Sequence, residues 1–154
     1  MTDADEAMTE QPERTAEVVE LQSPEQIAEL VCAVALQHVE RGETVAIHAR
    51  DDALAGELDG ALWTFRQNSF VPHVRLTEAE DPLLEPVLIF TGEPGDLQAD
   101  VLVMTPEGDV PDWFAGFAQV YDFAPVYDED LKQAARQRYA ACKDAGYRMR
   151  FRKG

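Results

Sequence analysis

A histidine followed by two aspartates is the group in this sequence that most resembles the site of an enzyme. His48 ends an apolar, β-branched stretch, and Asp51 and Asp52 follow within four residues. Open α/β sheets bind ligands at the carboxyl ends of their strands, where this histidine is expected to lie. A catalytic site would combine a nucleophile, a base and a group that orients the base, and these cannot be named together around His48. We therefore expect His48 to be structural and keep a small α/β enzyme as the alternative.

The sequence lacks the glycine-rich loop with which nucleotide-binding α/β proteins hold phosphate. The first strand candidate is followed by Leu21-Gln22-Ser23-Pro24, which has no glycine to bring the backbone close to a pyrophosphate. Gly92-Glu-Pro-Gly95 is a turn signal with an acid in its middle, which repels phosphate. Cys32 and Cys142 lack metal-ligand spacing, and we expect both to be reduced thiols packed in helices. We expect no catalysis, no metal and no cofactor.

A row of basic and aromatic side chains near the C-terminus forms the second candidate site. Lys132, Arg136, Tyr139 and Lys143 follow at increments of four, three and four residues. On an α-helix this spacing places them within an arc of about 60°. Such a row suits a short acidic peptide, because the cations pair with carboxylates and the tyrosine ring offers an apolar ledge. A solvated helix face is the alternative, and spacing alone favours neither.

The third candidate is the aromatic segment 62–73, where a predicted helix runs into a loop. Leu62 and Phe65 continue the apolar stripe of that helix and are expected to be buried. Trp63 and Phe70 fall off the stripe, and aromatic side chains on loops often anchor partner proteins. We therefore take Trp63 and Phe70 as candidates for a protein–protein surface.

The segment after the first strand candidate, 16–21, carries the clearest helix signals. Ser23 is a suitable N-cap, Pro24 suits the first helical position, and Gln26 completes a capping box. Apolar residues then recur at helical spacing until Arg41-Gly42, where a cation and a glycine are typical of a helix end. These signals predict a helix that begins at Pro24.

The rest of the chain alternates apolar strand candidates with helices. Strands are expected over 44–49, 86–91, 99–105 and 120–124, helices after Asp51 or Asp52, over 112–119 and from an N-cap at Asp128 to Gly146, and an edge strand or basic tail over 147–152. This alternation predicts an α/β fold of three layers, with a mostly parallel sheet and helices on both faces. The fold is expected to be Rossmann-like without a nucleotide-binding loop.

Length and composition indicate one domain. The 154 residues are 45% hydrophobic, which is enough for one buried core. Residues 1–14 are acidic and lack apolar periodicity, so we expect a disordered extension before a single domain over 15–154. The longest apolar stretches are too short for a membrane helix, and the acidic start differs from a signal peptide. We expect a cytoplasmic protein that does not bind membranes.

The charge is large and unevenly distributed. A net charge of −17 argues against direct binding of nucleic acid, whose phosphates repel an anion. Eight basic residues and one acidic residue follow Leu131, a net charge of +7 that leaves −24 for the remainder. This division predicts a basic receptor patch on an acidic body, and therefore an anionic partner.

Several motifs, in order and spacing, resemble the chi subunit family of bacterial DNA polymerase III. They are Leu62-Trp63-Thr64-Phe65-Arg66, Ser69-Phe70-Val71-Pro72-His73, Asp100-Val101-Leu102-Val103, Val110-Pro111, Phe114-x-x-Phe117, Leu131-Lys132-Gln133-Ala134-Ala135-Arg136-Gln137-Arg138-Tyr139 and Ala145-Gly146-Tyr147. Together they span nearly everything after residue 23. The resemblance implies an α/β fold without a nucleotide site and an accessory role in DNA replication, with no chemistry of its own.

The resemblance also implies two partner proteins. In this family, chi pairs with the psi subunit, which links it to the clamp loader, and binds the acidic, Phe-ended C-terminal tail of single-stranded-DNA-binding protein. Carried over residue by residue, the tail site falls on Lys132, Arg136 and Tyr139. Ala140 stands where the family can have a further basic residue, a place that Lys143 can take. The psi surface, which a helicase can share, falls on Trp63 and Phe70.

Overall fold

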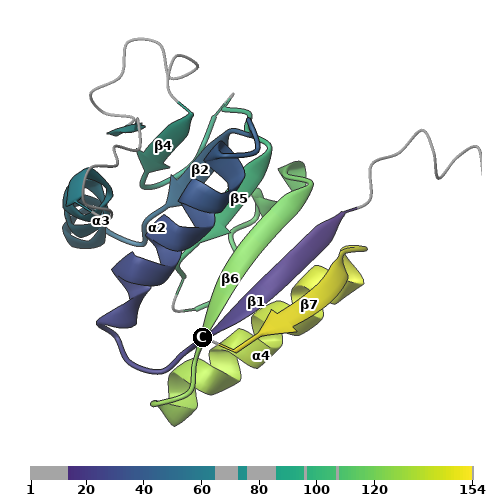
Figure 1. The fold of residues 1–154 in the computed structure, drawn as a ribbon. Coiled ribbons are helices and arrows are strands. Elements are labelled where there is room, and N and C mark those ends of the chain that lie inside the picture. The colour runs from purple at the N-terminus through teal and green to yellow at the C-terminus, as the bar shows by residue number, and fades with distance from the viewer. Residues whose placement is uncertain (1–13, 65–72, 76–85, 96, 107, 154) are drawn as a thin grey trace, which may run out of the picture.

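One parallel sheet organises the protein (Figure 1). The computed structural model describes residues 14–64, 73–75, 86–95, 97–106 and 108–153. Their elements are β1 (Thr15–Leu21), α2 (Gln26–Val39), β2 (Val45–His48), α3 (Asp52–Thr64), β3 (His73–Arg75), β4 (Val87–Phe90), β5 (Val101–Met104), the 3-10 helix η3 (Phe114–Gly116), β6 (Gln119–Pro125), α4 (Glu129–Asp144) and β7 (Arg148–Arg152). The seven strands lie in the order β3-β4-β2-β5-β6-β1-β7, and all their pairings are parallel. The predicted α/β class is confirmed.

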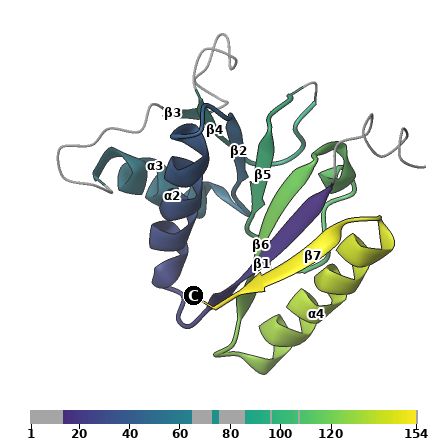
Figure 2. The ribbon, with the colours of Figure 1, turned by 45° about the vertical axis from the view of Figure 1, so that its right-hand side comes forward.

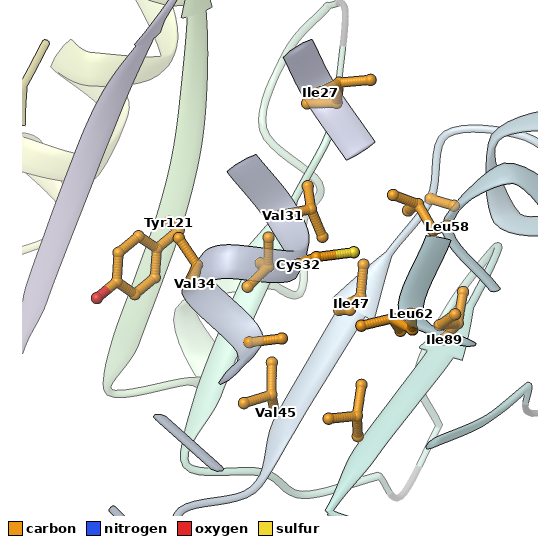
Figure 3. Packing of buried hydrophobic residues seen from close by; sticks show 14 of the residues in the cluster. Ile27, Val31, Cys32, Val34, Val45, Ile47, Leu58, Leu62, Ile89 and Tyr121 are labelled. Carbon is orange, nitrogen blue, oxygen red and sulfur yellow. The ribbon is translucent and has the colours of Figure 1, made fainter. Parts of the chain in front are cut away.

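Helices cover both faces of the sheet, as the sequence predicted (Figure 2). On one face, Val31 and Cys32 of α2 and Leu58 of α3 pack against Ile47 and Ile89 of the sheet (Figure 3). On the opposite face, a second cluster joins residues of η3 and α4 to the alternate positions of the same strands. Because successive strand side chains point to opposite faces, a strand buried on both is apolar throughout, as β4 and β5 are.

The start of α2 differs from the expected capping box. The helix begins at Gln26, and the Ser23 side chain does not cap it. The backbone carbonyl of Ser23 instead accepts a hydrogen bond from the Gln26 N–H at 3.1 Å. The Gln26 side chain reaches past Ser23 and accepts a hydrogen bond from the Gln22 N–H at 2.7 Å. Residues 22–25 therefore form a turn, and the prediction of a helix that begins at Pro24 was wrong.

The start and end of α4 agree with the prediction. Asp128 has an extended backbone, and its carboxylate accepts a hydrogen bond from the Leu131 N–H at 2.9 Å. Gly146 has a φ of 98°, a value that favours glycine, and it turns the chain out of the helix. The chain then forms β7, which pairs with β1 at the sheet edge, so the segment after Gly146 is an edge strand rather than a free tail.

Two other elements depart from the expected boundaries. The aromatic helix expected over 112–119 is the three-residue η3, and β3, which begins at the last residue of the segment 62–73, was not predicted. Both are too short for periodicity to identify. Both cysteines are buried free thiols in helices, as expected. Within the described ranges, none of the helices has the length and apolar character to cross a membrane.

Replacing Asp128 with alanine should lower the free energy of unfolding by about 1 kcal/mol, because the Leu131 N–H loses its cap. Ser23→Ala, the matched control, should leave stability nearly unchanged, because the hydrogen bond near the start of α2 uses the Ser23 carbonyl. Urea unfolding followed by circular dichroism compares the two variants. An equal loss of stability in both variants would contradict the assignment of a side-chain cap to Asp128 and not to Ser23.

Candidate functional site

A hollow of about 230 Å³ lies between α4 and the edge of the sheet. We call it the α4 hollow, and it is lined by Val18, Glu20, Ala124, Val126, Lys132, Ala135, Arg136, Tyr139 and Phe151. Three of the four residues in the predicted basic row, Lys132, Arg136 and Tyr139, therefore surround one cavity. Lys143 is exposed one helical turn beyond Tyr139 and is not among the lining residues.

Strand alternation supplies the apolar part of the α4 hollow. Val18 pairs with Phe151 across β1 and β7, so both side chains point to the α4 side of the sheet. Tyr139 is 38% exposed and Phe151 is 57% exposed, and they are two of the three large apolar side chains exposed among the described residues. Two such side chains on opposite walls of one cavity mark a surface suited to an apolar partner group.

The charges of the α4 hollow lie on the helix wall, with one acid opposite them. Arg136 makes a long hydrogen bond of 3.4 Å to Gln133 on its own helix, which is weak and easily exchanged for a ligand. Lys132 lies one turn earlier and is half-buried. Glu20 also lines the hollow, and its carboxylate accepts a hydrogen bond from the Gln22 side chain at 2.6 Å. Two cations and one acid leave the hollow weakly positive.

Arg138, one of the eight basic residues after Leu131, is a buried structural residue and not part of a basic surface patch. Its side chain is 1% exposed, and its Nε donates to Asp122 at 2.7 Å. Its other nitrogens donate to the carbonyls of Gly108 at 2.8 Å and Phe123 at 3.1 Å. Burial raises the pKa of the Asp122 carboxyl, and the charge of Arg138 opposes that rise.

A sequence signal for the burial of Arg138 exists. Ala135, Arg138 and Cys142 are the buried residues of α4, and they recur at increments of three and four. This is the spacing of a core-facing helix stripe, so the arginine in its middle needs a buried partner. Asp122, in a strand otherwise rich in apolar residues, is that partner.

The remaining basic residues of the C-terminus do not form one patch. Arg150 and Arg152 alternate with Phe151 along β7, so they point to the face of the sheet opposite the α4 hollow. Arg152 also makes an ion pair of 2.6 Å with Glu17. The predicted basic receptor patch therefore does not include all of these residues, because the pleat of the edge strand places Arg150 and Arg152 on a different surface from Lys132 and Arg136.

In the structure, His48 and Asp51 of the alternative, enzymatic site have different contacts. The His48 ring packs between Phe90 and Trp113, at centroid distances of 5.1 and 4.9 Å, and burial lowers its pKa. Asp51 instead caps α3 by accepting a hydrogen bond from the Leu54 N–H at 2.8 Å. Asp52 is the first residue of that helix. His48 therefore has a packing role among aromatic side chains, and Asp51 has a capping role.

The candidate partner surface is described only in part. Trp63 belongs to the last turn of α3, but its side chain lies outside the described part of the structure, and so does Phe70. The prediction that these aromatic residues bind a partner stays a prediction. Across the residues described, three or more His, Cys, Asp or Glu side chains nowhere gather in a group that could hold a metal ion.

Comparison with known proteins places these features in a family context. Residues 10–150 match the family model described as DNA polymerase III chi subunit, HolC. The chain is 31% identical over 131 residues to the DNA polymerase III subunit chi of Pseudomonas aeruginosa, covering 84% of this chain and 88% of the relative. It is 32% identical over 123 residues to the subunits of the same name from Escherichia coli and Haemophilus influenzae, covering 80% of this chain and 82% and 84% of those relatives. These matches confirm the resemblance.

Replacing Arg138 with methionine should lower the free energy of unfolding by about 3 to 5 kcal/mol, because Asp122 would remain buried without its cation. Chemical denaturation monitored by tryptophan fluorescence measures the change. The double variant Arg138→Met/Asp122→Leu removes both charges and should recover much of the loss. A double variant as unstable as the single one would mean that packing, rather than charge pairing, dominates at this position.

Proposed function

This chain belongs to the DNA polymerase III chi subunit family, and on that premise we propose that it is a non-catalytic adaptor between two other replication proteins. One partner is the psi subunit, which connects chi to the clamp loader. The other is the acidic, Phe-ended C-terminal tail of single-stranded-DNA-binding protein, which we assign to the α4 hollow. The observation that carries the assignment is the combination of cations and an apolar floor in one cavity.

The chemistry of a C-terminal phenylalanine fits the α4 hollow. The terminal carboxylate can accept two parallel hydrogen bonds from the guanidinium of Arg136, which lies at the exposed wall. The aromatic ring of the ligand would then contact Val18 and Phe151 on the sheet side and Tyr139 on the helix side. A chain terminus is therefore favoured over an internal acidic segment, because only a terminus places a carboxylate beside its last side chain.

Acidic residues that precede the terminal phenylalanine in the tail should be attracted to the α4 hollow more weakly than the terminal carboxylate. Lys132 is available to a carboxylate on the same wall, but Glu20 repels a second one. Such partly exposed ion pairs are screened by salt, so binding should weaken as ionic strength rises. The apolar contact is less sensitive to salt, and we therefore assign most of the specificity to the terminal phenylalanine.

The two proposed partners can bind at the same time. Trp63 lies on α3, which packs beside β3 and β4, whereas α4 packs beside β6 and β7 at the other end of the sheet (Figure 1). Neither surface uses residues of the other. A helicase-type partner that shares the Trp63 and Phe70 surface would therefore compete with psi rather than with the tail.

The Arg136→Ala substitution should weaken tail binding by about 1.5 to 3 kcal/mol, because the terminal carboxylate loses its bidentate partner. Fluorescence anisotropy with a labelled peptide that ends in Asp-Asp-Asp-Ile-Pro-Phe measures the affinity at low and moderate salt. Lys143→Ala is the matched control, since it removes one cation from the same helix outside the hollow. Unchanged affinity in folded Arg136→Ala protein, or an equal loss in both variants, would refute the assignment.

The Trp63→Ala substitution should abolish pairing with psi and leave the affinity for the tail peptide unchanged. Co-purification of co-expressed psi measures the first effect, and the anisotropy titration measures the second. Simultaneous loss of both activities would show that the Trp63 side chain supports the core instead of a partner surface.

A further inference from the structure

A second hollow, of about 160 Å³, lies on the opposite side of the same sheet edge. We call it the arginine hollow, and it is lined by Thr15, Glu17, Gln37, Arg41, Gln119, Val120, Tyr121, Arg150 and Arg152. Its residues come from the start of β1, the start of β6, the edge strand β7 and the last turn of α2 with the residues after it. The proposed tail site uses none of them.

Three guanidinium groups, one from the residues after α2 and two from β7, converge on this hollow. Arg152 is neutralised by Glu17, with Nε and Oε2 2.6 Å apart. Arg41 and Arg150 are both exposed, and within the described residues neither makes an ion pair. Bringing like charges together costs free energy unless an anion joins them, and a guanidinium pair is well suited to carboxylates.

The floor of the arginine hollow is polar but uncharged. Tyr121 is buried, and its hydroxyl is 2.7 Å from Nε2 of His38, whose Nδ1 is 2.6 Å from Glu43. Burial raises the pKa of Tyr121, so the phenol stays protonated and adds no competing negative charge. Gln119, which lines the hollow, donates to Glu43 at 3.3 Å, and Glu43 is not among the lining residues. The floor therefore provides hydrogen-bonding groups beneath the guanidinium groups.

An acidic segment of this chain comes shortly before Thr15, a lining residue of the arginine hollow, in the sequence. Residues 1–13 include Asp3, Asp5, Glu6, Glu10 and Glu13 and contain no lysine or arginine. The segment ends two residues before Thr15, which itself lines the hollow. At about 3.3 to 3.6 Å per residue, Glu10 is separated from Thr15 by at most about 18 Å of chain, and Glu13 by less. The short covalent connection and the opposite charges both favour contact between the acidic segment and the arginine side chains of the hollow.

We propose that the arginine hollow is a carboxylate-binding site that the acidic segment 1–13 of the same chain occupies. The tether gives the segment a local concentration of about millimolar at Arg41 and Arg150, so individually weak ion pairs suffice for binding. Occupation neutralises the two guanidinium groups on this face and leaves those on the α4 side for the partner's tail.

Paramagnetic relaxation in the full chain tests this assignment. A spin label is attached through Ala7→Cys, and the native thiols do not compete, because burial raises the pKa of Cys32 to about 12 and that of Cys142 to about 11. The label should broaden the amide signals of Gln37, Arg41 and Gln119 and spare those of Ala135 and Tyr139 on the opposite face. The broadening should disappear at about 0.5 M salt, where the screening length is about 4 Å.

Two charge variants of the labelled chain separate the site from general electrostatics. Arg41→Gln/Arg150→Gln should abolish the broadening, whereas Lys132→Gln/Lys143→Gln, which removes the same charge from the other face, should leave it in place. Broadening that is absent in the parent chain, centred on the α4 hollow, or equally sensitive to both double variants would overturn the proposal. The tail-peptide titration does not depend on this result, so either proposal can fail alone.

Discussion

The buried ion pair between Arg138 and Asp122 sets the orientation on which the surface of α4 depends. An unpaired charge in a protein interior is strongly unfavourable, so α4 can dock on β6 only with Arg138 directed at the Asp122 carboxylate. Arg136 and Tyr139, which flank Arg138 in the helix, are then turned away from the core and toward the α4 hollow. A buried ion pair adds little net stability over apolar packing. The main effect of this ion pair is to fix the rotation of α4 about its own axis.

The pleat of the edge strand β7 supplies the other geometric constraint. Phe151 points to the α4 side, where it forms a wall of the α4 hollow, while Arg150 and Arg152 point to the side of α2. The alternation of apolar and charged residues along β7 is also typical of a strand with one buried and one solvated face. In this protein, however, a cavity lies on each face of the strand. One short strand thereby contributes apolar surface to one site and cations to another.

Most of the fold could be predicted from the sequence, because buried parallel strands and amphipathic helices leave strong local patterns. The cap at Asp128 and the turn at Gly146 also depend on local chemistry, and both were predicted. Long-range pairing leaves no such pattern. The partnership of Arg138 with Asp122 depends on how α4 docks on β6, so the arginine was counted with the surface cations. The shared cavity of Phe151 and Arg136 likewise follows only from the position of β7 beside β1.

The overall charge of the chain bears on how an acidic ligand can bind at all. A net charge of −17 repels an acidic peptide at long range, so electrostatic steering cannot bring such a ligand to the surface. At physiological salt that repulsion is screened beyond about 8 Å, so the groups in and next to the α4 hollow act most strongly on a bound ligand. There Lys132 and Arg136 are opposed by Glu20, so the local charge is small. The apolar floor must therefore supply much of the binding free energy, which favours a ligand that combines a terminal carboxylate with an aromatic side chain.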